Sequence, residues 1–130
     1  MENIEIEGYS GDYFIPSVSF NATTGVCELA GESFLEETLK FYEPLLKWLD
    51  EFCKTAKKPI TFNFKLSYFN TSSSKRILDI LLIMKDYEDH GGKVTVNWIF
   101  DEEDIDIEED VEDLMIISEL KVNIIKSYEK

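Results

Sequence analysis

The order of predicted elements, β-β-α-β-α-β-α-β, indicates an α/β protein with one mixed β-sheet and helices packed against it. Three observations predict this class. A β-hairpin is expected within residues 17–30, residues 60–69 alternate as a strand does, and residues 77–87 have the apolar content of a buried helix. No repeat or long linker interrupts residues 1–130, so we expect one domain, with residues 1–15 as a less certain N-terminal extension.

The hairpin is predicted from alternation and a turn. Residues 17–21 (SVSFN) alternate apolar and polar side chains, and the turn after them contains Gly25, which tolerates a positive φ. Residues 26–30 supply the second strand. We expect residues 31–33 (GES) to end that strand.

The first helix is predicted from a capping signal and helical spacing. Ser33 followed by Glu36 matches the S-x-x-E capping box. Pro44 predicts either a kink or a later helix start, and Pro59 ends the segment. The side chains expected to face the core are Leu39, Tyr42, Leu45 or Leu46, Leu49 and Phe52.

The central strand and the second helix have the clearest patterns. Residues 60–69 (ITFNFKLSYF) predict a strand, and the second helix is expected to begin near Ser73 and to be apolar around most of its circumference. His90 and the two glycines after it predict its end. The side chains expected to share one face of the strand are Ile60, Phe62, Phe64, Leu66 and Tyr68.

Three further elements complete the chain. Residues 93–100 predict a strand, and the acidic run 101–113 follows it. A short helix is expected around 107–118, and 120–125 predict a last strand.

Charge excludes some partner classes. The chain carries 27 acidic and 13 basic residues, a formal net charge of −14. Nucleic acids and anionic membranes bind through Lys and Arg, so neither is expected as a partner, whereas a basic protein surface is compatible.

Cys27 and Cys53 have no zinc-ligand spacing and are interpreted as reduced thiols. The N-terminus lacks the apolar region of a signal peptide, and we expect a cytoplasmic protein.

Four consecutive hydroxyl residues, 71–74 (TSSS), lie between the central strand and the second helix. One of residues 70–73 is expected to cap the helix. The other interpretation is phosphate handling, because a helix N-terminus favours a phosphate and a hydroxyl placed there can be phosphorylated. Lys75 and Arg76 either contact that phosphate or face solvent or an acidic neighbour.

Catalytic and metal motifs are weak. The chain has no nucleotide-binding glycine motif, and its only histidine, His90, fits a helix C-terminus better than a general base. An enzyme and a bound cofactor are therefore not expected. The run 101–113 holds ten carboxylates without EF-hand spacing, and it either docks a basic partner or binds a divalent metal.

Three stretches together resemble the SiaC family of small bacterial regulatory phosphoproteins, whose fold is similar to STAS domains. The stretches are FNATTGVCELAGES with FYEPLLKWLDEF, YFNTSSSKRILDIL, and GGKVTVNWIFDEEDIDIEEDVEDL. The resemblance covers roughly residues 16 to 125. Leu35 and Glu37 stand where the family often has Pro and Asn.

The resemblance implies a partner-switching protein of cyclic di-GMP signalling and biofilm regulation. In the family, a cognate kinase phosphorylates the threonine of the N-T-S-S segment, a PP2C-type phosphatase reverses this, and the unphosphorylated form activates a diguanylate cyclase. Carried over here, the phosphoacceptor is Thr71. The expected flanking or partner-binding residues are Asn70, Ser72, Ser73, Lys75, Glu32 and Ser33. The alternative is a constitutive acidic interaction module, in which residues 71–74 only cap the helix.

Overall fold

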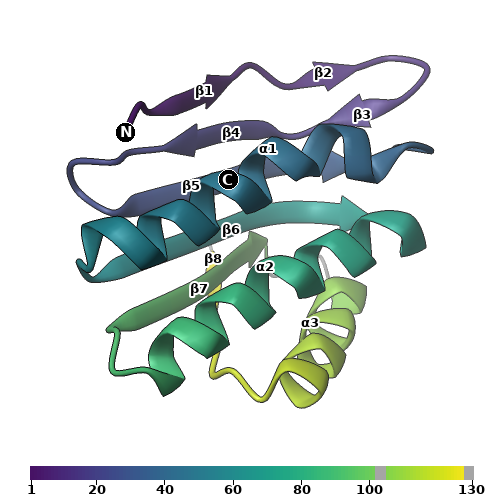
Figure 1. Ribbon diagram of the computed structural model, residues 1–130. Helices are drawn as coiled ribbons and strands as arrows, with labels where there is room; N and C mark the ends of the chain where they lie inside the picture. Colours follow the sequence, from purple (N-terminus) through teal and green to yellow (C-terminus); the bar gives the residue numbers. More distant parts are fainter. Residues whose placement is uncertain (102–104, 128–130) are drawn as a thin grey trace.

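A computed structural model describes residues 1–101 and 105–127 (Figure 1). The strands are β1 Ile4–Ile6, β2 Tyr9–Ser10, β3 Phe14–Ile15, β4 Ser17–Phe20, β5 Val26–Ser33, β6 Ile60–Phe69, β7 Val94–Asp101 and β8 Asn123–Ser127. The helices are α1 Thr38–Glu51, the π-helical turn η1 Phe52–Ala56, α2 Thr71–Asp89 and α3 Ile105–Ser118. Figure 1 shows α1 and α2 on the same face of one sheet, with α3 beside α2.

The main sheet has six strands in the order β1-β4-β5-β6-β7-β8. Pairing is antiparallel from β1 to β5 and parallel from β5 to β8. Each parallel connection passes through a helix, as such crossovers require. The predicted element order from the hairpin onward is confirmed.

Residues 1–15 form more of the β-structure than the sequence indicated. β1 forms the edge of the main sheet against β4, with Ile4 opposite Phe20. Trp48 of α1 donates its indole N–H to the carbonyl oxygen of Glu2, at 2.7 Å. β2 and β3 form a separate antiparallel pair. These strands have only two or three residues, too few for periodicity to reveal.

The two faces of the main sheet differ in chemistry. One face packs an aromatic core under the helices, in which Phe64 stacks on Trp98 with ring centroids 4.5 Å apart. The other face is polar: Asn97 donates to Asn63 at 2.9 Å and Asn123 donates to Asn97 at 3.0 Å. This alternation is typical of a sheet that is covered on one face and solvated on the other.

Two predictions at the carboxyl ends of β5 and β6 are wrong. β5 does not end at residue 30 but continues to Ser33, which pairs with Phe69. The register shifts between Gly31, which lies opposite Leu66, and Glu32, which lies opposite Tyr68, so no residue of β5 lies opposite Ser67. This bulge reverses the alternation of β6, so Phe69 faces the core while Tyr68, expected inside, is 46% exposed.

The capping-box prediction is also wrong. Ser33 belongs to β5, and α1 begins at Thr38 after Glu37, which makes no side-chain capping bond. Pro44 lies inside α1, so the helix does not begin late enough to place this proline in its first turn. Leu39, expected in the core, lies in the first turn of α1, and its side chain is 50% exposed. The buried side chains of α1 and η1 include Tyr42, Leu45, Trp48, Leu49 and Phe52.

The remaining elements lie close to their predicted positions. α2 begins at Thr71, two residues before the predicted Ser73, and Leu82 of α2 is 44% exposed, so that helix is less uniformly buried than expected. The predicted last strand, 120–125, is shifted to β8. Across residues 1–101 and 105–127, we find no helix with the length and apolar content needed to span a membrane.

Candidate functional site

Asn70 joins the end of β6 to the start of α2. Its side-chain oxygen accepts the backbone N–H of Ser73 at 2.9 Å, which makes it the N-cap. Its side-chain N–H donates to the carbonyl oxygen of Leu35 at 3.0 Å, and its backbone N–H donates to that of Ser33 at 3.0 Å. The prediction that one of residues 70–73 caps the helix is confirmed, and the cap is also tied to β5 and to the segment before α1.

Two of the predicted site residues, Ser33 and Ser73, are buried. The Ser33 hydroxyl lies 2.8 Å from the Ser73 hydroxyl and 2.7 Å from the Tyr42 hydroxyl, so it links β5, α2 and α1. Ser73 also donates to the carbonyl oxygen of Ser33, at 3.1 Å. Burial raises the pKa of Tyr42 to about 12, so its hydroxyl stays protonated and available to this network. These hydroxyls position α2.

Ser72 and Ser74 are also engaged. The Ser72 hydroxyl lies 2.9 Å from the Thr38 hydroxyl, which joins the first turns of α1 and α2. The Ser74 hydroxyl donates to the carbonyl oxygen of Thr71 at 2.7 Å. Both side chains are half-buried. Each hydroxyl of the run after Thr71 therefore has a structural partner.

Thr71 is different. Its side chain is exposed, and within residues 1–101 and 105–127 its hydroxyl makes no hydrogen bond. It lies at the first position of α2, where backbone N–H groups lack an intrahelical acceptor and the helix dipole favours an anion. The structure thus separates Thr71 from the three serines, a distinction that residue type did not provide.

A groove of about 230 Å³ lies beside Thr71, between the N-terminal end of α2 and α3. We call it the Thr71 groove. It has a mixed lining of apolar, neutral polar and acidic side chains. Its lining residues are Phe69, Asn70, Thr71, Ser74, Asp110, Asp113, Leu114 and Ile117. The sequence did not predict that carboxylates of the acidic run would lie next to Thr71.

The other predicted site residues lie in different places. Lys75 is exposed one helical turn after Thr71, and the described residues provide it with no ion pair. Arg76 instead places its Nε 3.4 Å from an oxygen of Asp79, which is the acidic neighbour considered for it. Glu32 does not line the Thr71 groove: it lies on β5 beside a hollow that also contacts Tyr9.

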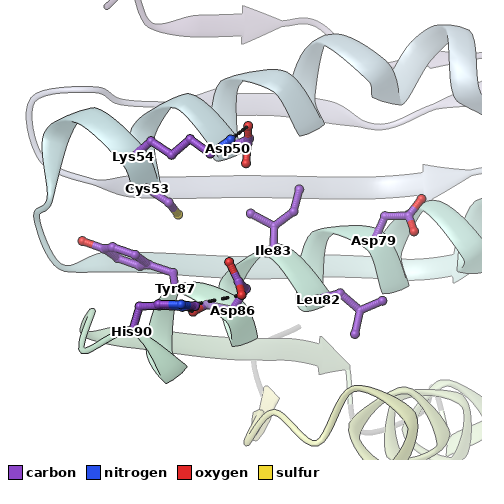
Figure 2. A pocket seen from close by; sticks show the side chains of 9 residues that line it. All are labelled: Asp50, Cys53, Lys54, Asp79, Leu82, Ile83, Asp86, Tyr87 and His90. Carbon is purple, nitrogen blue, oxygen red and sulfur yellow. Dashed lines mark hydrogen bonds and ion pairs between the residues drawn. The ribbon is translucent and has the colours of Figure 1, made fainter.

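A larger hollow, of about 490 Å³, lies between the C-terminal parts of α1 and α2 (Figure 2). Most of its ionisable side chains pair within it: Lys54 contacts Asp50 at 2.9 Å, and His90 lies 3.6 Å from Asp86. Cys53 points into it, and burial raises the pKa of this thiol to about 11, so it is not a thiolate at neutral pH. This arrangement provides no activated nucleophile.

The acidic run does not gather into a metal site within the described residues. There, no group of three or more His, Cys, Asp or Glu side chains is arranged to hold an ion. Residues 102–104 of the run lie outside the described residues. Cys27 is buried and Cys53 is half-buried, and both are free thiols, as expected.

The fold and the site define a small mixed α/β protein that presents one exposed threonine at a helix N-terminus, next to a groove that two carboxylates line in part. The chain belongs to the SiaC family of regulatory phosphoproteins, whose family model matches residues 9–127. It is therefore a regulatory phosphoprotein by family.

Individual relatives come from Pseudomonas aeruginosa. An uncharacterised protein of strain UCBPP-PA14 is 25% identical over 91 residues, which cover 70% of this chain and 72% of that relative. The solved structure of SiaC superposes with a TM-score of 0.87 at 22% identity, covering 98% of this chain and all of that one. A chain of the crystal structure of the diguanylate cyclase SiaD in complex with its activator SiaC superposes with a TM-score of 0.83 at 21% identity. The match covers 94% of this chain and 100% of that one. These structures confirm the predicted fold class.

Proposed function

We propose that this chain is a partner switch controlled by phosphorylation of Thr71. A cognate kinase adds the phosphate, a PP2C-type phosphatase removes it, and the unphosphorylated form binds and activates a diguanylate cyclase. The observation that carries the proposal is the geometry of the hydroxyl run: Thr71 alone among its four residues combines an exposed side chain with a hydroxyl that makes no hydrogen bond in the described part of the chain.

The surroundings of Thr71 support an electrostatic mechanism. A phosphate there adds nearly two negative charges at neutral pH. The α2 dipole and Lys75 partly compensate these charges, so the phosphorylated form remains folded. Asp110 and Asp113 line the same groove, so the phosphate also raises a negative charge that is already present. A partner that covers the groove must then remove water from a phosphate dianion, and its affinity falls.

The partner class is supported by a relative. SiaC of P. aeruginosa is the activator of the diguanylate cyclase SiaD in their crystal structure. The family match over residues 9–127 makes a diguanylate cyclase the first partner to test for this chain.

The first experiment identifies the phosphoacceptor. The chain is incubated with its cognate kinase, ATP and Mg²⁺, and its intact mass is measured. We expect the mass of one phosphate to be gained by wild type and by Ser74→Ala, the matched control, and not by Thr71→Ala. Thr71→Ala should change the free energy of unfolding by less than about 0.5 kcal/mol, because the side chain is exposed. A gain in Thr71→Ala would place the acceptor elsewhere, and no gain in wild type would favour the constitutive module.

The second experiment tests the switch. The unphosphorylated and phosphorylated chains are titrated into a purified diguanylate cyclase of the organism that encodes this chain. We expect binding and activation only with the unphosphorylated form. PP2C-type phosphatase treatment should restore both. Equal affinity of the two forms would contradict the proposal.

A further inference from the structure

The solvent face of α3 combines exposed isoleucines with unpaired carboxylates. Ile116 is 74% exposed and Ile117 is 61% exposed, more than any other large apolar side chain in residues 1–101 and 106–126. Helical spacing places Asp113 three and four residues before them, on the same side of the helix. We call Glu109, Asp110, Asp113, Ile116 and Ile117 the α3 face.

The carboxylates of this face lack cations. On α3, Glu108 contacts Lys126 at 3.2 Å, whereas no described Lys or Arg pairs with Glu109, Asp110 or Asp113. These three side chains are exposed. Neighbouring unpaired carboxylates repel one another, and a Lys or Arg from a partner removes that repulsion.

The α3 face is continuous with the Thr71 groove. Asp110, Asp113 and Ile117 belong to both. A segment that lies on Ile116 and Ile117 therefore reaches Thr71 without leaving the surface. Leu114 and Phe69 provide an apolar floor to the groove, since both are buried and line it.

From this continuity we infer that the α3 face is the docking surface for an amphipathic segment of the diguanylate cyclase. Apolar side chains of that segment pack on Ile116 and Ile117, and its Lys or Arg side chains pair with Asp110 and Asp113. The inference rests on the proposed function and adds the surface and the chemistry of the partner. A second copy of this chain fits less well, because each copy has a net charge of −14 and would bring the same carboxylates to the contact.

This placement explains how Thr71 controls docking. The phosphate enters at the end of the surface that the partner must dehydrate, and charge placed in such an interface opposes association through desolvation and like-charge repulsion. Isoleucine burial supplies affinity, and the carboxylates supply salt-dependent attraction.

The test measures binding of the purified, full-length cyclase used above to unphosphorylated variants of this chain. Ile116→Ser and Ile117→Ser should each raise the Kd at least about tenfold, as loss of a central apolar anchor does. The matched control is Val26→Ser, because Val26 is 42% exposed and lies at the amino end of β5, away from α3. It should bind as wild type.

A second pair of variants tests the charges. Asp110→Asn and Asp113→Asn should raise the Kd and reduce its dependence on salt between about 50 and 300 mM, where screening changes strongly. Circular dichroism and urea midpoints check that all variants fold, which their exposure favours.

Each outcome decides the inference. Wild-type affinity of both isoleucine variants, or an unchanged salt dependence in both asparagine variants, would overturn the docking surface and leave the phosphorylation switch in place. No binding of the wild-type chain to the cyclase would overturn both. Gel filtration showing a dimer that the isoleucine variants abolish would assign the face to a second copy instead.

Discussion

The two ends of α2 are closed in different ways. At the N-terminal end, Asn70, Ser72 and Ser73 bond to residues of β5, α1 and the segment between them, 34 or more positions away in the chain: Ser73 to Ser33 spans 40 residues, for example. At the C-terminal end, Gly91 and Gly92 donate to the carbonyl oxygens of Glu88 and Tyr87, at 3.0 and 2.9 Å. That pattern is a Schellman motif, which a helix forms from its own last turn.

The two ends of α2 therefore differ in what determines their position. A local closure needs only the sequence of the helix, so it ends α2 wherever the glycines stand. A closure made by distant elements fixes the first turn of α2 relative to β5 and α1. Thr71 lies in that fixed turn, so its exposed side chain is held in one position relative to β5 and α1.

The largest effect is expected from Ser33→Ala. Its hydroxyl contacts both Ser73 and Tyr42, and the change leaves the buried Tyr42 hydroxyl without its partner. We expect a loss of about 2 kcal/mol in the free energy of unfolding, measured in urea. The double variant with Tyr42→Phe should lose less than the sum of the two single variants, because both partners are then removed. Additive losses would show that the network is not coupled.

A smaller effect is expected from Asn70→Ala. We expect it to lower the free energy of unfolding by about 1 to 2 kcal/mol, because it removes the N-cap and the bond to Leu35. Asn70→Asp separates these roles. The carboxylate still accepts the Ser73 N–H but cannot donate to Leu35, so urea midpoints should place this variant between wild type and Asn70→Ala. An aspartate variant as unstable as the alanine variant would mean that the link to Leu35, and not the cap, dominates.

At the C-terminal closure, we expect Gly91→Ala to lower the free energy of unfolding by about 1 kcal/mol. Gly91 has φ +94, and an added Cβ would meet no atom within 4 Å, so the cost comes only from the backbone. Gly91→Asn should lose less, because asparagine tolerates positive φ better. Thermal unfolding of the three proteins measures the difference. Equal stability of alanine and glycine would contradict the role assigned to the motif.

The smallest effect concerns His90. Its bond to the Asp86 carbonyl oxygen and the Asp86 carboxylate raise the pKa of His90 above the ordinary 6.5. Protonated His90 therefore stabilises the fold fully below pH 6.5, and this contribution is lost as pH rises through the folded pKa. His90→Gln should remove that part of the pH dependence of unfolding. NMR titration of this single imidazole checks the shift, and a folded pKa at or below 6.5 would contradict it.

The sequence was sufficient where local signals decide structure. Ile60 to Phe69 form a strand with the predicted bounds, and His90 with Gly91 ends α2 as predicted. It was insufficient at the carboxyl ends of β5 and β6. The bulge at Ser67 depends on pairing with a strand far away in the chain, so alternation wrongly placed Tyr68 inside. Ser33 matched a capping box by spacing, but pairing with Phe69 kept it in a strand.

By itself, the sequence determined the order of strands and helices from the β4–β5 hairpin onward, the hydroxyl run before α2 and the negative charge of the chain. These depend on residue type and short-range spacing. Only the tertiary structure decided that Ser73 is buried against Ser33, that Thr71 is exposed, and that carboxylates of α3 lie beside it. The reason is physical: burial and electrostatic neighbours are set by which distant segments pack together, and neighbouring hydroxyls in a helical turn point in different directions.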